Sequence, residues 1–332
     1  MSETDNELKN VLPEYVKNQI IPIELISFIN MYISKKLSNE TIRTVVEYYY
    51  LYDENKKKEV EANYGKINNW DVSDVTDMTF LFYDLPSTNF NEDISKWNVS
   101  KVTNMYGMFH SATSFNHPLN NWNVSNVTCM ESMFWNTTNF NQPLNNWNVS
   151  SVTNMREMFG GAISFNQPLN NWNVSSVTCM REMFGYTESF NQPIDNWNVS
   201  KVRDMKRMFE YTESFNQPID NWNVSSVESM ECMFEGTESF NQPLNNWNVS
   251  NVIIMDSMFE SSASFNQPLN NWDISKAIRF KLKLYRKPLD NWNVSNSYIM
   301  DSMFDCAESF NQPINNWDLS TPIRYKLMLD SI

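Results

Sequence analysis

A tryptophan returns every 25 residues between Trp122 and Trp272, each time within a near-copy of Phe-Asn-Gln-Pro-Leu-Asn-Asn-Trp-Asn-Val-Ser. A fixed period of this length predicts a solenoid, in which each repeat forms one coil. A single repeat is too small to bury its own apolar face, so successive coils must stack and share one elongated core. The repeat therefore favours a binding surface, rather than a catalytic cleft, as the functional feature of the chain.

The spacing of apolar residues within one repeat predicts the elements of a coil. Trp122 and Val124 are two positions apart, which places both on the inner side of one short strand. The next apolar residues follow at spacings of three and four, which is typical of one face of a short helix or helical turn. They are Val127, Met130, Met133 and Phe134. We therefore expect a leucine-rich-repeat-like α/β solenoid with one short parallel strand and one helical turn per coil. Its predicted core tryptophans are Trp122, Trp147, Trp172, Trp197, Trp222 and Trp247.

The chain divides into two predicted parts. Residues 1–64 follow a helical pattern, with Ile23, Ile26, Ile29 and Ile33 on one face, and we expect them to cover the open end of the solenoid. Residues 65–332 form the solenoid, including a shortened coil at 272–291 and a cap at 317–332.

An asparagine recurs two residues before the proline of each repeat. Because proline lacks an amide hydrogen, this tripeptide must form a corner outside any fully paired strand. Stacked asparagine amides at such a corner can bond the backbone of neighbouring coils. The predicted structural ladder consists of Asn116, Asn141, Asn166, Asn191, Asn216, Asn241, Asn266 and Asn311.

Differences between the repeats are concentrated after the predicted strand, whereas the outward strand positions stay Asn, Asn and Ser in nearly every copy. A specific partner would therefore contact the helix and loop side, on the convex surface of a right-handed solenoid. Drift at exposed positions explains the same variation equally well. The candidate partner contacts are Arg156, Arg181, Tyr186, Lys206, Arg207 and Tyr211.

Sequence motifs for catalysis are absent. The two histidines, His110 and His117, have no cysteine or histidine neighbours at metal-ligand spacing, and the chain lacks a glycine-rich phosphate loop and a nucleophile motif. We therefore expect no catalytic residues, no metal and no cofactor, and predict that the protein is not an enzyme. The formal charge of −14 argues against a nucleic-acid partner.

Cellular location is indicated by three absences. The acidic start of the chain does not resemble a signal peptide, and no apolar stretch is long enough to enter a membrane. Cys129 and Cys179 occupy the same position two repeats apart, which at ~4.8 Å per coil is too far for a disulfide. We therefore expect reduced thiols and an intracellular setting, in the cytoplasm, a host cytoplasm or a virion.

The repeat Trp-Asn-Val-Ser-Ser-Val-Thr-Asn-Met-Arg-Glu-Met-Phe, followed by Phe-Asn-Gln-Pro-Leu, occupies residues 147–169 and resembles the BspA-like leucine-rich-repeat family. The resemblance covers about residue 65 to the end of the chain. It implies a role in protein binding or adhesion, because such repeats occur in bacterial surface proteins, in protist surface proteins and in large DNA viruses of protists. This chain departs from the surface members in lacking a signal peptide, a lipid-attachment cysteine and a wall-sorting tail.

The leading hypothesis is a non-enzymatic scaffold that binds a protein partner through the solenoid surface. A second hypothesis is a substrate receptor of a ubiquitin ligase, because residues 21–29 are similar to the start of an F-box. A third is a structural or adhesion component of a viral particle or cell surface, with an invariant strand face that self-associates.

Overall fold

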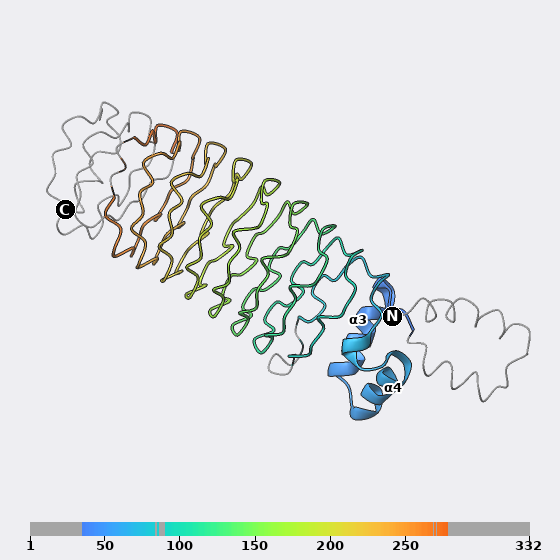
Figure 1. The fold of residues 1–332 in the computed structure, drawn as a ribbon. Helices are drawn as coiled ribbons and strands as arrows, with labels where there is room; N and C mark the ends of the chain where they lie inside the picture. The colour runs from blue at the N-terminus through green and yellow to red at the C-terminus, as the bar shows by residue number, and fades with distance from the viewer. Residues whose placement is uncertain (1–34, 84, 86–89, 268, 270, 278–332) are drawn as a thin grey trace, which may run out of the picture.

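The computed structural model describes residues 35–83, 85, 90–267, 269 and 271–277 of the 332-residue chain. Within these residues the repeats form a row of similar coils stacked along one axis, and a small helical segment lies at the N-terminal end of the row (Figure 1). The F-box-like stretch, most of the shortened coil and the predicted C-terminal cap lie outside the described residues.

Within the described residues, two helices precede the first coil. Helix α3 (Asn39–Tyr50) begins after Ser38, and helix α4 (Glu54–Tyr64) begins after Asp53 and ends at Gly65. The carboxylate of Asp53 accepts hydrogen bonds from two amides in the first turn of α4, which satisfies donors that a helix start leaves free. A short 3₁₀ turn, η1 (Ile67–Asn69), leads into the solenoid. Among the described residues, no helix is both long and apolar enough to cross a membrane.

Helix α3 packs against the first coil and covers its apolar face. The buried side of α3 includes Tyr49, whose ring meets the ring of Trp70 edge-on with centroids 5.6 Å apart. The side-chain oxygen of Asn39 accepts a hydrogen bond of 2.9 Å from the amide of Thr76. Such contacts satisfy the apolar and polar groups that the end of a solenoid would otherwise expose to water.

The core of the solenoid consists of columns in which equivalent side chains stack from coil to coil. The rings of Trp147 and Trp172 lie 6.4 Å apart and within 1° of parallel. Each indole N–H is also satisfied, as when Trp147 donates to the carbonyl of Leu119 at 2.9 Å. The six predicted core tryptophans are all buried, with exposed fractions of 2–4%. Two phenylalanine columns, two methionine columns, two valine columns and one column of leucine or isoleucine also belong to the core.

The structure corrects the predicted strand and helix of each coil. Trp122 and Val124 face inward, but neither they nor their counterparts in the described coils belong to a strand. Parallel pairing occurs instead as isolated bridges seven residues after the tryptophan, where Cys129 pairs with Asn104 and Asn154. Cys129 and Cys179 therefore flank one intervening coil, and both are free thiols.

Tight turns replace the predicted helical segment. In the coil that begins at Trp122, the amides of Met133, Trp135 and Thr137 each donate to the carbonyl three residues earlier. Two residues of this segment, Ser132 and Asn136, have φ values of 52° and 54°. Each is the third residue of its turn, the position at which a type II turn requires a positive φ. A right-handed helix cannot accommodate positive φ values. The spacing of three and four is thus produced by successive turns.

The asparagines form a continuous ladder through the described coils. The side-chain oxygen of Asn166 accepts from the amide of Asn191 at 3.0 Å and from the side-chain amide of Gln192 at 2.9 Å. The same amide-to-oxygen bond, at 2.9–3.0 Å, links equivalent asparagines from Asn91 to Asn266. Asn311 lies outside the described residues.

Candidate functional site

The variable residues of the repeats lie together along one edge of the solenoid, which we call the variable edge. It comprises residues 131–138, 156–163, 181–188, 206–213, 231–238 and 256–263. In the first five of these segments, every second amide donates to the next coil, as when Ser132 and Phe134 donate to the carbonyls of Arg156 and Met158 at 2.8 and 2.9 Å. The other amides close the tight turns. This pattern holds the backbone of the edge in place and leaves its side chains free to vary.

The variable edge is strongly acidic. It carries four cations, at Arg156, Arg181, Lys206 and Arg207. It carries eleven carboxylates, at Glu131, Glu157, Glu182, Glu188, Glu210, Glu213, Glu231, Glu235, Glu238, Asp256 and Glu260. The resulting formal charge of −7 is half of the charge of the whole chain, −14.

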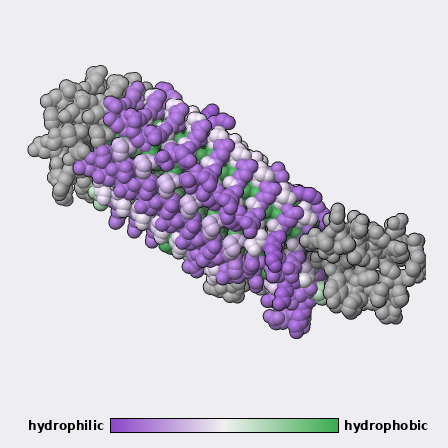
Figure 2. All heavy atoms as spheres, viewed as in Figure 1, coloured by the Kyte–Doolittle hydropathy of each residue, from purple (hydrophilic) through white to green (hydrophobic). Residues whose placement is uncertain are grey.

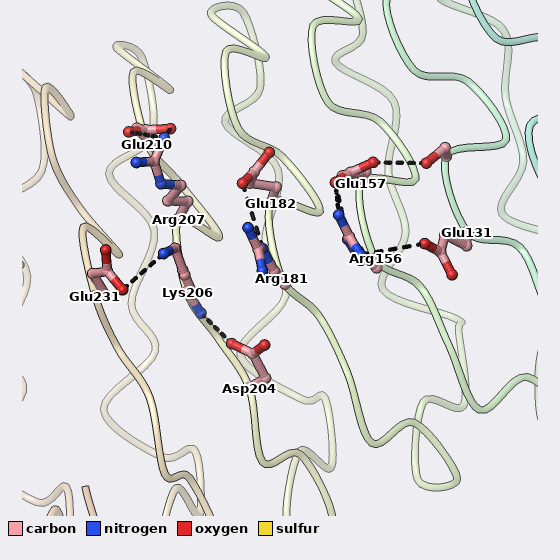
Figure 3. A network of polar contacts seen from close by, with 11 residues as sticks. Glu131, Arg156, Glu157, Arg181, Glu182, Asp204, Lys206, Arg207, Glu210 and Glu231 are labelled. Carbon is pink, nitrogen blue, oxygen red and sulfur yellow. Dashed lines mark hydrogen bonds and ion pairs between the residues drawn. The ribbon is translucent and has the colours of Figure 1, made fainter. Parts of the chain in front are cut away.

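Two of the candidate partner contacts are arginines held by neighbouring carboxylates (Figure 3). The guanidinium of Arg156 donates twice to Glu157, at 2.9 and 2.7 Å, and lies 3.7 Å from Glu131 in the preceding coil. Arg181 lies 3.6 Å from Glu182. The sequence predicts these arginines as contacts for a partner and does not predict their ion pairs.

Lys206 and Arg207 are also paired within the chain (Figure 3). Lys206 donates to Glu231 of the next coil at 2.8 Å, and Arg207 lies 3.2 Å from Glu210. The side chain of Glu210 is only 3% exposed. Burial raises the pKa of Glu210 to about 6, although the positive charge of Arg207 acts in the opposite direction. All four candidate cations are thus neutralised from within the variable edge.

The two candidate tyrosines form an exposed aromatic pair. The rings of Tyr186 and Tyr211 stack with centroids 5.1 Å apart, and the residues are 43% and 36% exposed. Ile163, in the coil before Tyr186, is 39% exposed. Most of the surface in view is hydrophilic, with separate small hydrophobic patches along the coils (Figure 2). Exposed apolar side chains are therefore confined to small patches of this face.

Aromatic side chains of the edge lie over glycines of the following coil. A Cβ atom added to Gly160 would stand 2.3 Å from the ring of Trp135, and one added to Gly236 would stand 2.4 Å from the ring of Tyr211. Sequence reasoning missed these pairs, although the spacing of 25 residues between aromatic and glycine is visible once the repeats are aligned. Pairing of this kind means that substitutions on the edge are coupled between neighbouring coils.

A groove opens on the variable edge beside Tyr186. It has a volume of about 310 Å³ and is lined by Trp135, Asn136, Gly161, Ile163, Tyr186 and Glu188. Only Tyr186 of these residues was among the candidate contacts. The signal that could have revealed the groove is the absence of a side chain at Gly161, where the next two coils carry Tyr186 and Tyr211.

Among the described residues, one group brings three metal-binding side chains together. The ligand atoms of Glu210, Cys232 and Glu235 lie within 4.8 Å of one another. Arg207 already pairs with Glu210, and burial together with Glu235 raises the pKa of the Cys232 thiol. A thiol must lose its proton to ligate a metal, so both features oppose metal binding here.

The two histidines make local contacts. The ring of His110 meets Tyr83 edge-on at 4.9 Å, and its Nδ1 lies 3.0 Å from the hydroxyl of Ser111. His117 Nε2 lies 3.0 Å from the carbonyl oxygen of Asn91.

Comparison with known proteins identifies one matching family model, described as "Mycoplasma protein of unknown function, DUF285". It matches five overlapping segments, at residues 49–160, 121–212, 142–238, 193–284 and 278–331. Together these segments span residues 49–331, so the match covers the tandem repeats as a whole. No curated protein and no solved structure matches the chain.

Proposed function

The chain belongs to the DUF285 family of tandem-repeat proteins, and we propose that it is a non-enzymatic scaffold that binds a protein partner through its variable edge. The family has no assigned function, so the proposal depends on the geometry of the edge. The resemblance to BspA-like leucine-rich repeats, whose common role is protein binding or adhesion, supports it.

The observation that carries the proposal is the contrast between two surfaces of the same coils. The Asn-Trp-Asn-Val-Ser face repeats almost unchanged, and its exposed asparagines bond locally, as when Asn173 accepts from the amide of Ser175 at 3.2 Å. The variable edge differs in every coil and exposes Ile163, Tyr186 and Tyr211 to water. Exposed aromatic side chains next to charged groups are typical of binding surfaces in which a few residues supply most of the affinity.

The ion pairs of the edge refine the proposal. Because Arg156, Arg181, Lys206 and Arg207 are paired with carboxylates of the same chain, they do not supply free positive charge to a partner. The aromatic pair and the exposed carboxylates of Glu188, Glu213 and Glu238 are then the groups available to a partner. This distribution does not favour an acidic partner such as a nucleic acid, which requires an accessible basic surface.

Free thiols support an intracellular setting for this activity. The three described cysteines, Cys129, Cys179 and Cys232, are unpaired, as is common where the compartment is reducing. The protein partner would then be a cytoplasmic protein.

Affinity capture from cell lysate, followed by mass spectrometry, tests the proposal. The edge variant replaces all six candidate contacts with serine, and the matched control replaces Asn123, Asn148 and Asn173 of the repetitive face with serine. We expect partners to be captured by the native chain and by the control but not by the edge variant. Equal capture by all three proteins, with circular dichroism showing that each is folded, would refute the assignment of the edge.

A further inference from the structure

The groove beside Tyr186 lies where the tyrosine stack lacks one ring. Neighbouring rings at the Tyr186 position stack 5.1 Å apart, and the preceding coil has Gly161 there instead of a ring. Asn136, Gly161 and Tyr186 are equivalent positions of three successive coils, and the middle one carries no side chain. One layer of the stack is therefore missing between Asn136 and Tyr186. The groove of about 310 Å³ occupies this layer.

Tyr186 lines the groove, so the ring face that Tyr211 leaves uncovered is available to a ligand there. Its other face is covered by Tyr211, which in turn lies over Gly236 of the following coil. Trp135 lies over Gly160 and also lines the groove, and Ile163 adds an exposed apolar side chain to the lining. The groove thus offers an aromatic face and an apolar wall to a flat group.

The charge around the groove selects the kind of flat group. Glu188 lines the groove, and Glu213 and Glu238 occupy the equivalent exposed position in the next two coils. Within the described part of the chain, no cation lies within ion-pairing distance of these three carboxylates. A neutral aromatic ligand would leave this charge unused, whereas a cation would be attracted both by the carboxylates and by the ring face.

We propose that the groove binds an arginine side chain from a basic segment of a protein partner. The guanidinium stacks on the open face of Tyr186 and forms an ion pair with Glu188. Arginine meets these requirements better than lysine, because its guanidinium is planar, stacks on aromatic rings and pairs with carboxylates through two parallel hydrogen bonds. Following arginines or lysines of the same segment pair with Glu213 and Glu238. This inference rests on the proposed function and specifies the partner's chemistry.

The chain itself supplies the substitution that closes the groove. Gly161 has a φ of 68°, and the tyrosines at the equivalent positions have φ values of 58° and 50°. A Cβ atom at Gly161 would meet Asn136 at 3.4 Å, which is an ordinary contact. Gly161→Tyr therefore extends the tyrosine stack into the groove without a new backbone conformation. Ser261→Tyr makes the same change at an equivalent position, with a φ of 59°, four coils further along the solenoid.

The test measures binding of the fluorescent peptide acetyl-(Gly-Arg)₄-amide to the full chain by anisotropy. Two matched peptides replace arginine with lysine or with citrulline, which has the shape of arginine without its charge. We expect the arginine peptide to bind more tightly than both, and Gly161→Tyr and Glu188→Gln each to weaken its binding about tenfold, equal to about 1.4 kcal/mol. Ser261→Tyr should leave it unchanged.

Three results would overturn the inference: no binding of the arginine peptide, equal binding of the lysine or citrulline peptide, or equal weakening by Ser261→Tyr. A dimer of the native chain that dissociates in Gly161→Tyr would identify a second copy as the occupant, and would also overturn it. The proposed function fails separately, through the capture experiment. Partners that are lost from the six-residue edge variant but retained by Gly161→Tyr would leave the scaffold proposal standing and refute the arginine site.

Discussion

Removing one asparagine from the ladder tests how the coils are held together. In Asn166→Ala, the amide of Asn191 and the side-chain amide of Gln192 both lose the oxygen that they share, at 3.0 and 2.9 Å. The bond from the amide of Asn166 to Asn141 is unaffected, because a backbone donor makes it.

The magnitude follows from these two lost bonds. Each contributes about 1 kcal/mol net, and a half-buried donor left without a partner adds to the loss, so we expect the free energy of unfolding to fall by about 2–3 kcal/mol. Guanidinium chloride unfolding followed by tryptophan fluorescence and circular dichroism measures this change. Coincidence of the two probes establishes that the coils unfold together, which the comparison requires.

Two control variants separate the ladder bond from the loss of an asparagine as such. Asn173→Ala removes an exposed asparagine whose side-chain oxygen accepts only from the amide of Ser175, and it should cost less than about 1 kcal/mol. Asn166→Asp keeps an oxygen for both donors and should retain most of the stability. If Asn166→Ala is no more destabilising than Asn173→Ala, the ladder does not stabilise the solenoid as argued.

Three further predictions concern the core, the edge and the buried carboxylate. Phe184→Ala removes a fully buried ring that stacks on Phe190 at 4.1 Å, so the free energy of unfolding should fall by about 3–5 kcal/mol in a denaturant titration; a loss below 1 kcal/mol would contradict the packing. Gly160→Ala places a methyl group against the ring of Trp135, so the free energy of unfolding measured by calorimetry should fall by about 1–3 kcal/mol. Most of this loss should disappear in the double variant with Trp135→Ala. If the losses of the two single variants simply add, the ring does not lie against Gly160. Folding raises the pKa of Glu210 to about 6 from an ordinary 4.5, so the stability that its protonated form contributes is complete below pH 4.5 and is lost as the pH rises through 6. The free energy of unfolding of the native chain minus that of Glu210→Gln should therefore fall by about 1–2 kcal/mol between pH 4.5 and 7.5. A difference that does not change with pH would refute the shift.

The sequence was sufficient to predict the solenoid and its core, because the period of 25 residues and the repeated apolar positions are properties of every coil. It was not sufficient for the local backbone. Ser132, Glu157 and Arg207 all have positive φ values, yet none is a residue that usually indicates one. Gly161 and Gly236, at the second left-handed position of their coils, were the available signal for turns in place of a helix.

The candidate site was only partly predictable for a related reason. Variation between repeats located the edge, but pairing across coils depends on residues 25 positions apart, as for Lys206 and Glu231. Reading each repeat separately hides such pairs, and it hides the empty layer at Gly161 as well. Aligning the coils side by side reveals both, because a parallel stack places equivalent residues next to one another.

Site-specific photo-crosslinking tests most directly the central claim that the variable edge contacts the partner. A benzophenone amino acid is introduced at Ile163 in one protein and at Asn173 in another, since both positions are exposed, on the edge and on the repetitive face respectively. After irradiation in lysate, we predict crosslinked adducts from Ile163 and none from Asn173. Adducts from Asn173 with none from Ile163 would contradict the account and assign binding to the repetitive face.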